Sequence, residues 1–159
     1  MKKRRNLKVL LACLVIVYAI AFLGSLFTSP NTGPDSEWYQ SIRPSITPPN
    51  WVFPVVWNVL FFLIALSLYL AWIDSKSIKQ KKTLAWIFGI NLFVNFLWSV
   101  LYFGLKNPAF AFVDLIAIWI SIIGMIYVTN KINKTSSYLL IPYFLWVSFA
   151  GVLNYLSIP

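Results

Sequence analysis

Residues 38–57 read WYQSIRPSITPPNWVFPVVW, a stretch that holds three tryptophans, four prolines and one arginine. Most of it lies in residues 28–52, the longest connection between the apolar segments of the chain. A proline restricts the residue before it to extended or turn geometry, and tryptophan rings need apolar cover. The composition therefore predicts an ordered segment, and we expect the rest of the chain to supply the surface that this segment covers.

The composition of the whole chain is that of a protein embedded in a membrane. Of the 159 residues, 60% are hydrophobic and only 11% are charged, and the mean hydropathy is +0.76. Soluble domains average roughly 45–50% apolar and about 25% charged residues. A soluble fold of this size could not bury so much apolar surface. We therefore expect an all-α integral membrane protein that forms a single domain over residues 1–159.

Five apolar segments are long enough to cross a bilayer, which takes about 20 mostly apolar residues of helix. They cover residues 7–27, 53–73, 83–103, 109–129 and 137–158. Only helices and closed barrels satisfy the backbone in lipid, and the sequence lacks the short alternating segments of barrel strands. These observations predict a five-helix transmembrane bundle with a structured lid loop, residues 28–52, between the first two helices.

The N-terminus, MKKRRNLK followed by an apolar run, resembles a signal peptide with Ala19, Ile20 and Ala21 as its cleavage motif. The run is longer than the apolar region of a signal peptide, which has about 7–15 residues. This length favours a first helix that is retained. Cleavage would leave the orientation of the later helices unchanged.

The distribution of positive charge predicts the orientation of the bundle. The chain has 13 Lys and Arg residues against four Asp and Glu, for a formal net charge of +9. Eleven of the 13 precede the first predicted helix or lie in the second and fourth connections, whereas only Arg43 and Lys106 lie on the other side. This asymmetry predicts a plasma-membrane protein with a cytoplasmic N-terminus and an outside C-terminus. The charge indicates contact with anionic lipid and not with nucleic acid.

The tryptophan-rich loop then lies outside the cell, and two interpretations of it remain. Its aromatic rings could form a belt at the membrane interface. Alternatively, the loop folds over the bundle as a lid, because a connection this long in a compact protein is usually functional or disordered and its composition argues against disorder. We favour the lid.

Unusual side chains recur at one depth beneath this loop. Helical spacing places them on shared faces of four predicted helices, in or near the outer half of the bundle. They are Trp57 and Phe61; Asn91, Asn95 and Trp98; Asp114; and Tyr143, Trp146, Ala150 and Asn154. A cavity with aromatic walls and a few amide groups is typical of a ligand site.

Each of these residues also has a purely structural interpretation. Asn91 and Asn95 could hydrogen-bond between helices, and Trp98 could pack in the core. Asp114 could lie shallow enough to stay hydrated, although an ionisable residue within a span is by default a functional candidate. The shared depth favours a common pocket, in which the small side chain of Ala150 leaves room.

Few residues are suited to conventional catalysis. The chain has no histidine and only one cysteine, Cys13, and it lacks a close carboxylate pair, a nucleophile beside a base and a glycine-rich phosphate loop. This inventory argues against a hydrolase and against a metal site. Tryptophan can exchange electrons or absorb light, so a photochemical activity stays open.

Three motifs together resemble the translocator protein / tryptophan-rich sensory protein (TspO/MBR, peripheral-type benzodiazepine receptor) family, and its bacterial members in particular. The first is the loop pattern W38-Y39…R43-P44…P48-P49-x-W51-x-F53-x-x-x-W57. The second is N91-x-x-x-N95-x-x-W98-S99, and the third is L139-L140-x-P142-Y143-x-x-W146-x-x-F149-A150-x-x-L153-N154. The motifs follow the family order and cover nearly the whole chain.

The resemblance implies a five-helix bundle, usually dimeric, whose first loop caps a pocket for porphyrins such as protoporphyrin IX and for isoquinoline- or benzodiazepine-type drugs. The positions that match the family's pocket are Tyr39, Trp51, Trp57, Phe61, Asn95, Trp98, Trp146 and Ala150. In bacterial members the tryptophans that match Trp57 and Trp146 are associated with light-dependent porphyrin breakdown. The resemblance thus implies a porphyrin receptor in tetrapyrrole transport, sensing or disposal. The alternatives are a light-dependent protoporphyrin-degrading enzyme and a stress-regulatory membrane subunit whose ligand is a signal.

The sequence departs from the family pattern at two points. Asn91 stands where many members have Gln, a mild exchange of one amide for another. The family's sterol motif needs a Lys or Arg shortly after a Tyr in the last helix, but Tyr155 is followed only by LSIP, which puts sterol binding in doubt.

The ligand inventory also bears on the type of porphyrin. Without histidine, only Cys13, two methionines and the tyrosines could ligate haem iron, so we expect a preference for metal-free porphyrin and no required cofactor. We expect its carboxylates to reach Arg43 or the amides. A homodimer is implied by the resemblance, and A85-x-x-x-G89 is one of several small-residue faces that could form it.

Overall fold

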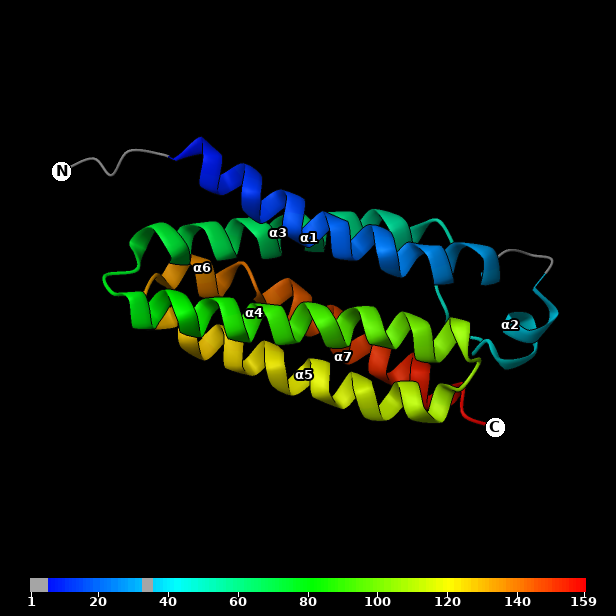
Figure 1. Cartoon of the computed structure of the whole chain (residues 1–159). Helices are drawn as coiled ribbons and strands as arrows, with labels where there is room; N and C mark the ends of the chain where they lie inside the picture. The colour runs from blue at the N-terminus through cyan, green and yellow to red at the C-terminus, as the bar shows by residue number, and fades with distance from the viewer. Residues whose placement is uncertain (1–5, 33–35) are drawn as a thin grey trace.

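The computed structural model describes residues 6–32 and 36–159, and all regular structure in these ranges is helical (Figure 1). The long helices are α1 (Leu7–Thr28), α3 (Val52–Asp74), α4 (Ile78–Ser99), α5 (Pro108–Asn130) and α7 (Ile141–Leu156). Shorter elements are the 3₁₀ turn η1 (Ser29–Asn31), α2 (Glu37–Ile42), the π-helical segment η2 (Val100–Gly104) and α6 (Lys134–Tyr138).

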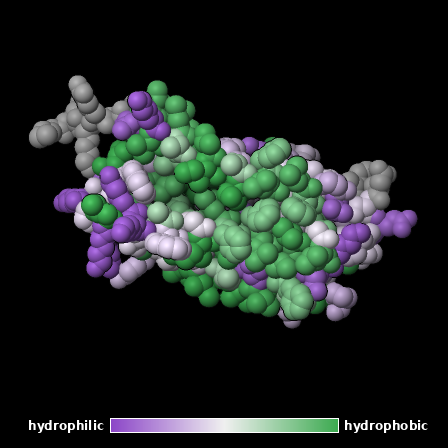
Figure 2. Space-filling view, in the orientation of Figure 1, coloured by the Kyte–Doolittle hydropathy of each residue, from purple (hydrophilic) through white to green (hydrophobic). Residues whose placement is uncertain are grey.

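Within the described ranges, five helical segments are long and apolar enough to cross a membrane. They are Leu7–Asn31, Val52–Asp74, Ile78–Gly104, Pro108–Asn130 and Lys134–Leu156. Figure 2 shows a broad hydrophobic band between two more polar ends. The prediction of an all-α, five-helix membrane bundle with a structured loop after the first helix is confirmed.

Helix α4 begins five residues before the predicted segment 83–103. The Ser77 hydroxyl caps it by accepting the Gln80 backbone N–H at 3.2 Å. Lys79 and Lys82 therefore lie in the first turns of α4 and not in a loop. Hydropathy misplaced this boundary because long lysine side chains keep their charge in water while their stems cover apolar surface.

The fifth predicted helix, residues 137–158, is divided into α6 and α7. Pro142, near the start of α7, has no backbone N–H to donate, and its ring crowds the carbonyl four residues earlier. Asn133 caps α6 through the Ser136 N–H at 2.9 Å, so the helical structure also starts earlier than predicted. The two pieces together still make one span.

The long helices form a closed ring in the order α3, α1, α4, α5, α6/α7 and back to α3. The end of the ring away from the lid is solidly packed. Its fully buried side chains include Ile64, Leu84, Phe88, Ile122, Met125 and Leu140. Ser67 on α3 and Ser136 on α6 join their hydroxyls at 2.9 Å and close the ring there. A cavity inside the ring of helices is therefore expected nearer the lid.

The lid, residues 28–52, is less irregular than its sequence suggests. Helix α2 forms inside it, with the Ser36 hydroxyl accepting the Tyr39 N–H. In Figure 1 α2 lies at the end of the bundle where α1 ends and α3 begins. The Trp38 ring packs edge-on against Tyr102, with ring centroids 5.8 Å apart, and Tyr39 is buried against Phe103. The lid is thus held to the ends of the helices by aromatic contacts.

Candidate functional site

A cavity of about 530 Å³ lies beneath the lid, between the long helices. Seven of the eight residues predicted as ligand contacts line it, and they come from the lid, α3, α4 and α7. They are Tyr39, Trp57, Phe61, Asn95, Trp98, Trp146 and Ala150. Protein ligand sites typically enclose about 300–1,000 Å³, with mostly apolar walls and a few polar groups.

The eighth predicted contact, Trp51, does not line the cavity. It occupies the N-cap position of α3 and its side chain is 68% exposed. The first turn of α3 places Phe53 and Pro54 against the cavity in its place. The geometry therefore does not support the prediction that Trp51 contacts a ligand, which stays untested.

One wall of the cavity is a cluster of aromatic rings from α3 and α7. Trp57 stacks on Phe61 with ring centroids 5.3 Å apart, and its edge meets Tyr143 at 6.2 Å. Trp146 packs against Phe53 at 5.9 Å. Its indole Nε1 is buried and has no hydrogen-bond partner among the described residues. The structure therefore leaves this donor unsatisfied in a residue that lines the cavity.

The facing wall is held by hydrogen bonds between helices. Trp98 stacks on Tyr102 with ring centroids 4.9 Å apart and donates its Nε1–H to Asn154 Oδ1 at 2.9 Å. Asn154 in turn donates to the Pro108 carbonyl at 2.8 Å, which joins α4, α7 and the start of α5. The Tyr102 hydroxyl donates to Ser157 at 2.9 Å. This wall is therefore rigid, and its polar atoms are already used within the protein.

A chain of polar side chains crosses the bundle below the cavity. Asn95 donates to the Tyr143 hydroxyl at 3.0 Å, and that hydroxyl donates to Asn91 Oδ1 at 3.2 Å. Asn91 then donates to Ser121 at 2.8 Å. Asn91 does not line the cavity, so the structure supports its interhelical interpretation, whereas Asn95 both bonds between helices and lines the cavity.

Asp114 and Arg43, the two charged candidates, also lie outside the cavity lining. Asp114 is buried in α5, and its Oδ2 has no hydrogen-bond partner in the described parts of the chain. Arg43 donates from Nη2 to the Pro48 carbonyl at 2.8 Å and lies 5.9 Å from the Tyr39 ring. Arg43 therefore braces the lid, and its contact with ligand carboxylates stays a prediction.

Sequence reasoning missed a hydroxyl-rich rim under the lid. The part of the cavity lining next to the lid includes Thr28, Ser29, Thr32, Thr47 and Asn50. Asn50 donates to the Thr32 carbonyl at 2.9 Å and ties the lid to the end of α1. The Thr47 Oγ1 is buried and has no partner among residues that the structure describes. This lid hydroxyl is therefore an unsatisfied hydrogen-bonding group in a residue beside the cavity.

Helix α1 forms a third wall, which the sequence interpretation also missed. Tyr18, Ala21, Gly24 and Ser25 line the cavity, and the Tyr18 hydroxyl donates to the Asn58 carbonyl at 3.1 Å. A Cβ added at Gly24 would lie 3.3 Å from Ser99 Oγ, so glycine lets α1 approach α4 closely. The small residues of α1 could have indicated that this helix lies against the cavity, but the same spacing of small residues also occurs at helix–helix contacts between protomers.

The π-helical segment η2 determines how α4 ends at the cavity. Its wider turn, closed by the Leu105 N–H bonded to the Val100 carbonyl at 2.8 Å, directs Tyr102 and Phe103 into the cavity lining. Lys106 follows with φ of 51° and places its Nζ 5.8 Å from the Trp38 ring. Such π segments often occur at functional sites. Here η2 joins the lid to the rigid wall.

Tyr39 is the lid residue whose ionisation is altered by its surroundings. Burial raises the pKa of its hydroxyl, and the nearby Arg43 guanidinium opposes this with a smaller lowering effect. The hydroxyl is therefore neutral at physiological pH. A neutral phenol at the cavity roof can donate a hydrogen bond without adding negative charge.

Comparison with known proteins agrees with this architecture. Residues 12–157 match the model of the TspO/MBR family. The chain is 40% identical over 154 residues to the tryptophan-rich protein TspO of Archaeoglobus fulgidus, which covers 94% of this chain and 95% of that protein. It is 32% identical over 153 residues to the protein of the same name from Chlorobaculum tepidum, covering 95% and 94%. Similarity to the translocator protein of Bos taurus is 27% over 136 residues, covering 84% and 79%. The chain therefore belongs to the TspO/MBR family of multi-pass membrane proteins.

Proposed function

We propose that this protein binds porphyrins such as protoporphyrin IX in the cavity beneath the lid and acts in tetrapyrrole transport, sensing or disposal. The observation that carries this proposal is the lining of the cavity: seven of eight positions predicted from the family pocket meet around one space of about 530 Å³. The same aromatic walls are suited to flat isoquinoline- or benzodiazepine-type drugs. Family membership supports the proposal.

The walls and the rim suggest how a porphyrin lies. A flat apolar macrocycle would pack against the faces of Trp57 and Trp146, since aromatic rings prefer stacked or edge-on contact. Its carboxylates would face the rim, where Thr47 Oγ1 and the Tyr39 hydroxyl can donate. Trp146 Nε1, which has no partner within the described ranges, would donate to the macrocycle or its substituents.

The test compares protoporphyrin IX with its dimethyl ester, which keeps the macrocycle and removes the negative charge. We expect Thr47→Val to weaken protoporphyrin IX binding about tenfold, because a hydrogen bond to a charged group contributes on the order of 1.5–3 kcal/mol. Binding of the ester should change little. Ser45→Ala is the matched control, since Ser45 is an exposed lid hydroxyl outside the lining.

Affinities would be measured by quenching of tryptophan fluorescence with the purified protein in detergent. Failure of the wild-type protein to bind protoporphyrin IX would reject the proposed function. If Thr47→Val weakens binding of protoporphyrin IX and of its dimethyl ester equally, the rim does not bind the carboxylates, although the cavity is still the binding site.

A second candidate function is light-dependent oxidation of the bound porphyrin, with dioxygen as the oxidant. It is favoured by the positions of Trp57 and Trp146, which both line the cavity and could exchange electrons with an excited macrocycle. Illumination of the complex in air should then yield an open-chain product catalytically. Trp57→Phe or Trp146→Phe should abolish product while porphyrin still binds. Unchanged turnover in both variants would exclude this chemistry.

The available iron ligands favour metal-free porphyrin. Cys13 and Met125 are buried in the packed core and do not line the cavity. Of the three tyrosines that line it, Tyr18 and Tyr102 donate their hydroxyls to protein groups. The third is Tyr39, whose pKa is raised by burial, which disfavours the phenolate that would ligate iron. We expect haem to bind less tightly than protoporphyrin IX. A haem complex with strong axial-ligand spectra and equal affinity would contradict this.

We further propose the orientation and the assembly expected from the sequence. Lys8, Lys79 and Lys134 lie at the end opposite the lid, whereas Arg43 and Lys106 lie at the lid end, so the positive-inside rule favours a lid outside the plasma membrane.

A homodimer could form at Gly89, where an added Cβ would meet nothing within 4 Å. Crosslinking through Gly89→Cys in membranes tests this contact.

A further inference from the structure

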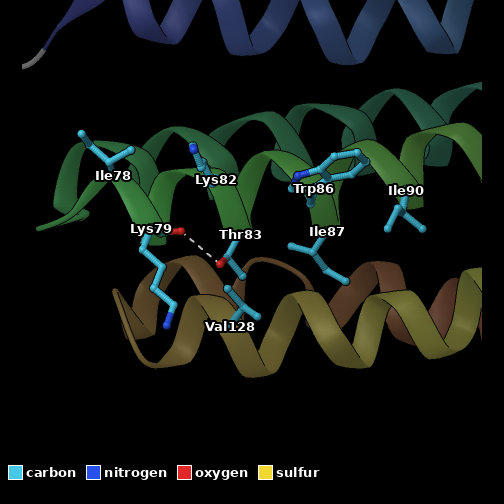
Figure 3. Close-up of a pocket in the computed structure, with 8 residues that line it drawn as sticks. All are labelled: Ile78, Lys79, Lys82, Thr83, Trp86, Ile87, Ile90 and Val128. Atoms are coloured by element: carbon cyan, nitrogen blue, oxygen red, sulfur yellow. Dashed lines mark hydrogen bonds between the residues drawn. The ribbon is translucent and has the colours of Figure 1, made fainter.

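A second hollow lies at the opposite end of the bundle, far from the lid. It is an open groove of about 570 Å³ between the start of α4 and the end of α5 (Figure 3). Lys79 and Lys82 lie at one end of it, and Trp86, Ile87 and Ile90 follow along α4. None of the functions proposed above uses this groove.

Helical spacing aligns these residues along one face of α4. Lys82, Trp86 and Ile90 are separated by four residues each, so their side chains follow one another along the helix. From Lys79 to Ile90 the helix rises roughly 16 Å, at about 1.5 Å per residue. One leaflet is half of a hydrocarbon core about 30 Å thick, so the groove has the length of one leaflet.

The floor of the groove is formed by close packing of α4 on α5. A Cβ added at Gly124 would lie 3.0 Å from Ile87 Cδ1, so glycine allows Ile87 to sit deep between the helices. Val128 continues the floor toward the lysines. Trp86 remains 72% exposed and forms the wall. The result is an apolar channel on the surface that faces lipid.

The charge at the end of the channel is positive. Figure 3 shows Lys79 extending from the start of α4 toward α5, whereas Lys82 extends to the other side of α4. Both lysines line the groove at this end. Among the described residues, Glu37 lies in the lid and Asp114 in the lid-side half of α5. Asp74 lies at the lysine end but accepts a hydrogen bond from Asn133 at 2.7 Å.

We propose that this groove is a binding site for one anionic phospholipid of the bilayer. The phosphate lies at the lysine end beside Lys79, with Lys82 adding positive charge at that end, and one acyl chain lies in the channel along Trp86 and Ile90. Basic pockets between transmembrane helices are suited to anionic head groups, and interfacial tryptophan is suited to the boundary between head group and chain. Ala85 and Gly89, the predicted dimer contact, do not line the groove.

The test is lipid binding to the full-length protein, measured by native mass spectrometry with phosphatidylglycerol and phosphatidylcholine of equal chain length. Lys79→Gln combined with Lys82→Gln should weaken phosphatidylglycerol binding by roughly tenfold or more and leave phosphatidylcholine binding unchanged. Lys79→Arg with Lys82→Arg should restore it. The matched control, Lys131→Gln with Lys134→Gln, removes two charges at the same end of the bundle and should have little effect.

Three results would overturn the proposal. If the control pair weakens phosphatidylglycerol binding as much as the Lys79/Lys82 pair does, the lipid is attracted by the overall positive charge of this end and not by a specific site. No weakening by the Lys79/Lys82 pair would mean that the groove binds no anionic lipid. If the protein forms a dimer without lipid and Lys79 and Lys82 are protected from acetylation in that dimer, the groove is an interface with a second copy of the chain and not a lipid site. Protoporphyrin IX binding should stay at the wild-type level in every variant, which keeps this test separate from the proposed function.

Discussion

Replacement of Trp98 by phenylalanine should destabilise the bundle more than its change in size implies. The substitution keeps an aromatic ring that can stack on Tyr102 but removes the Nε1–H donor to Asn154 Oδ1 at 2.9 Å. Asn154 is 1% exposed, and its amide nitrogen is already bonded to the Pro108 carbonyl. Its oxygen would therefore be left buried without a partner.

The size of the effect follows from two limits. An orphaned buried acceptor costs about 1–3 kcal/mol in proteins. Hydrogen bonds between membrane helices contribute about 0.6 kcal/mol on average and at most about 1.7, because the unfolded chain in the membrane also finds partners. Since Asn154 cannot turn to another donor without breaking its bond to Pro108, we expect about 1.5 kcal/mol, near the upper limit.

The assay is equilibrium unfolding in mixed micelles by titration with sodium dodecyl sulfate, followed by circular dichroism. Trp119→Phe is the matched control, because it removes the same kind of bond, to Ser148 at 2.9 Å, on the outer surface of α5. Ser148 keeps its bond to the Phe144 carbonyl, so we expect about 0.6 kcal/mol or less. Equal losses in the two variants would refute the role of Asn154 in bracing the cavity wall.

Two further predictions concern the cavity and its lid. Ala150→Phe should reduce protoporphyrin IX binding by at least tenfold by placing a ring in the cavity, whereas Val152→Phe on the exposed face of α7 should not; equal affinities in isothermal titration would contradict this placement. Burial raises the pKa of Tyr39, so the packed lid favours the neutral hydroxyl over the phenolate. The contribution of Tyr39 to the stability of the lid should therefore be present at neutral pH and be lost as the pH rises above the usual tyrosine pKa of about 10. Proteolysis within the lid should then accelerate above that pH in wild-type protein but not in Tyr39→Phe, and an identical pH dependence in both proteins would remove Tyr39 as the cause.

Hydropathy was sufficient to predict the five spans, because a bilayer imposes a minimum apolar length that the sequence displays directly. It misplaced the start of α4 because Lys79 and Lys82 lower the local hydropathy without ending the helix. It also joined α6 to α7, although Pro142 gave a local signal for the break. Helix α2 was missed because six residues are too few to show helical periodicity.

Most of the residues that periodicity within single helices singled out do line the cavity, because residues spaced by three or four positions share a face. Periodicity could not identify which helix faces which, so the wall formed by α1 was missed. Nor could it indicate that Ser121 of α5 accepts a hydrogen bond from Asn91 of α4 inside the bundle. Trp51 belongs to the tryptophan-rich loop motif, but at the N-cap position of α3 its side chain is exposed and does not line the cavity, so its contact with a ligand stays a prediction. The segment η2 has no sequence signal that we can identify.

The site proposed for porphyrin is tested most directly by the structure of the protein with protoporphyrin IX bound, determined by crystallography or electron microscopy. We expect density for the macrocycle beneath the lid, against the faces of Trp57 and Trp146, with its carboxylates directed at Thr47. Density for the macrocycle only on the outer surface of the bundle, with the cavity beneath the lid unchanged, would contradict that site.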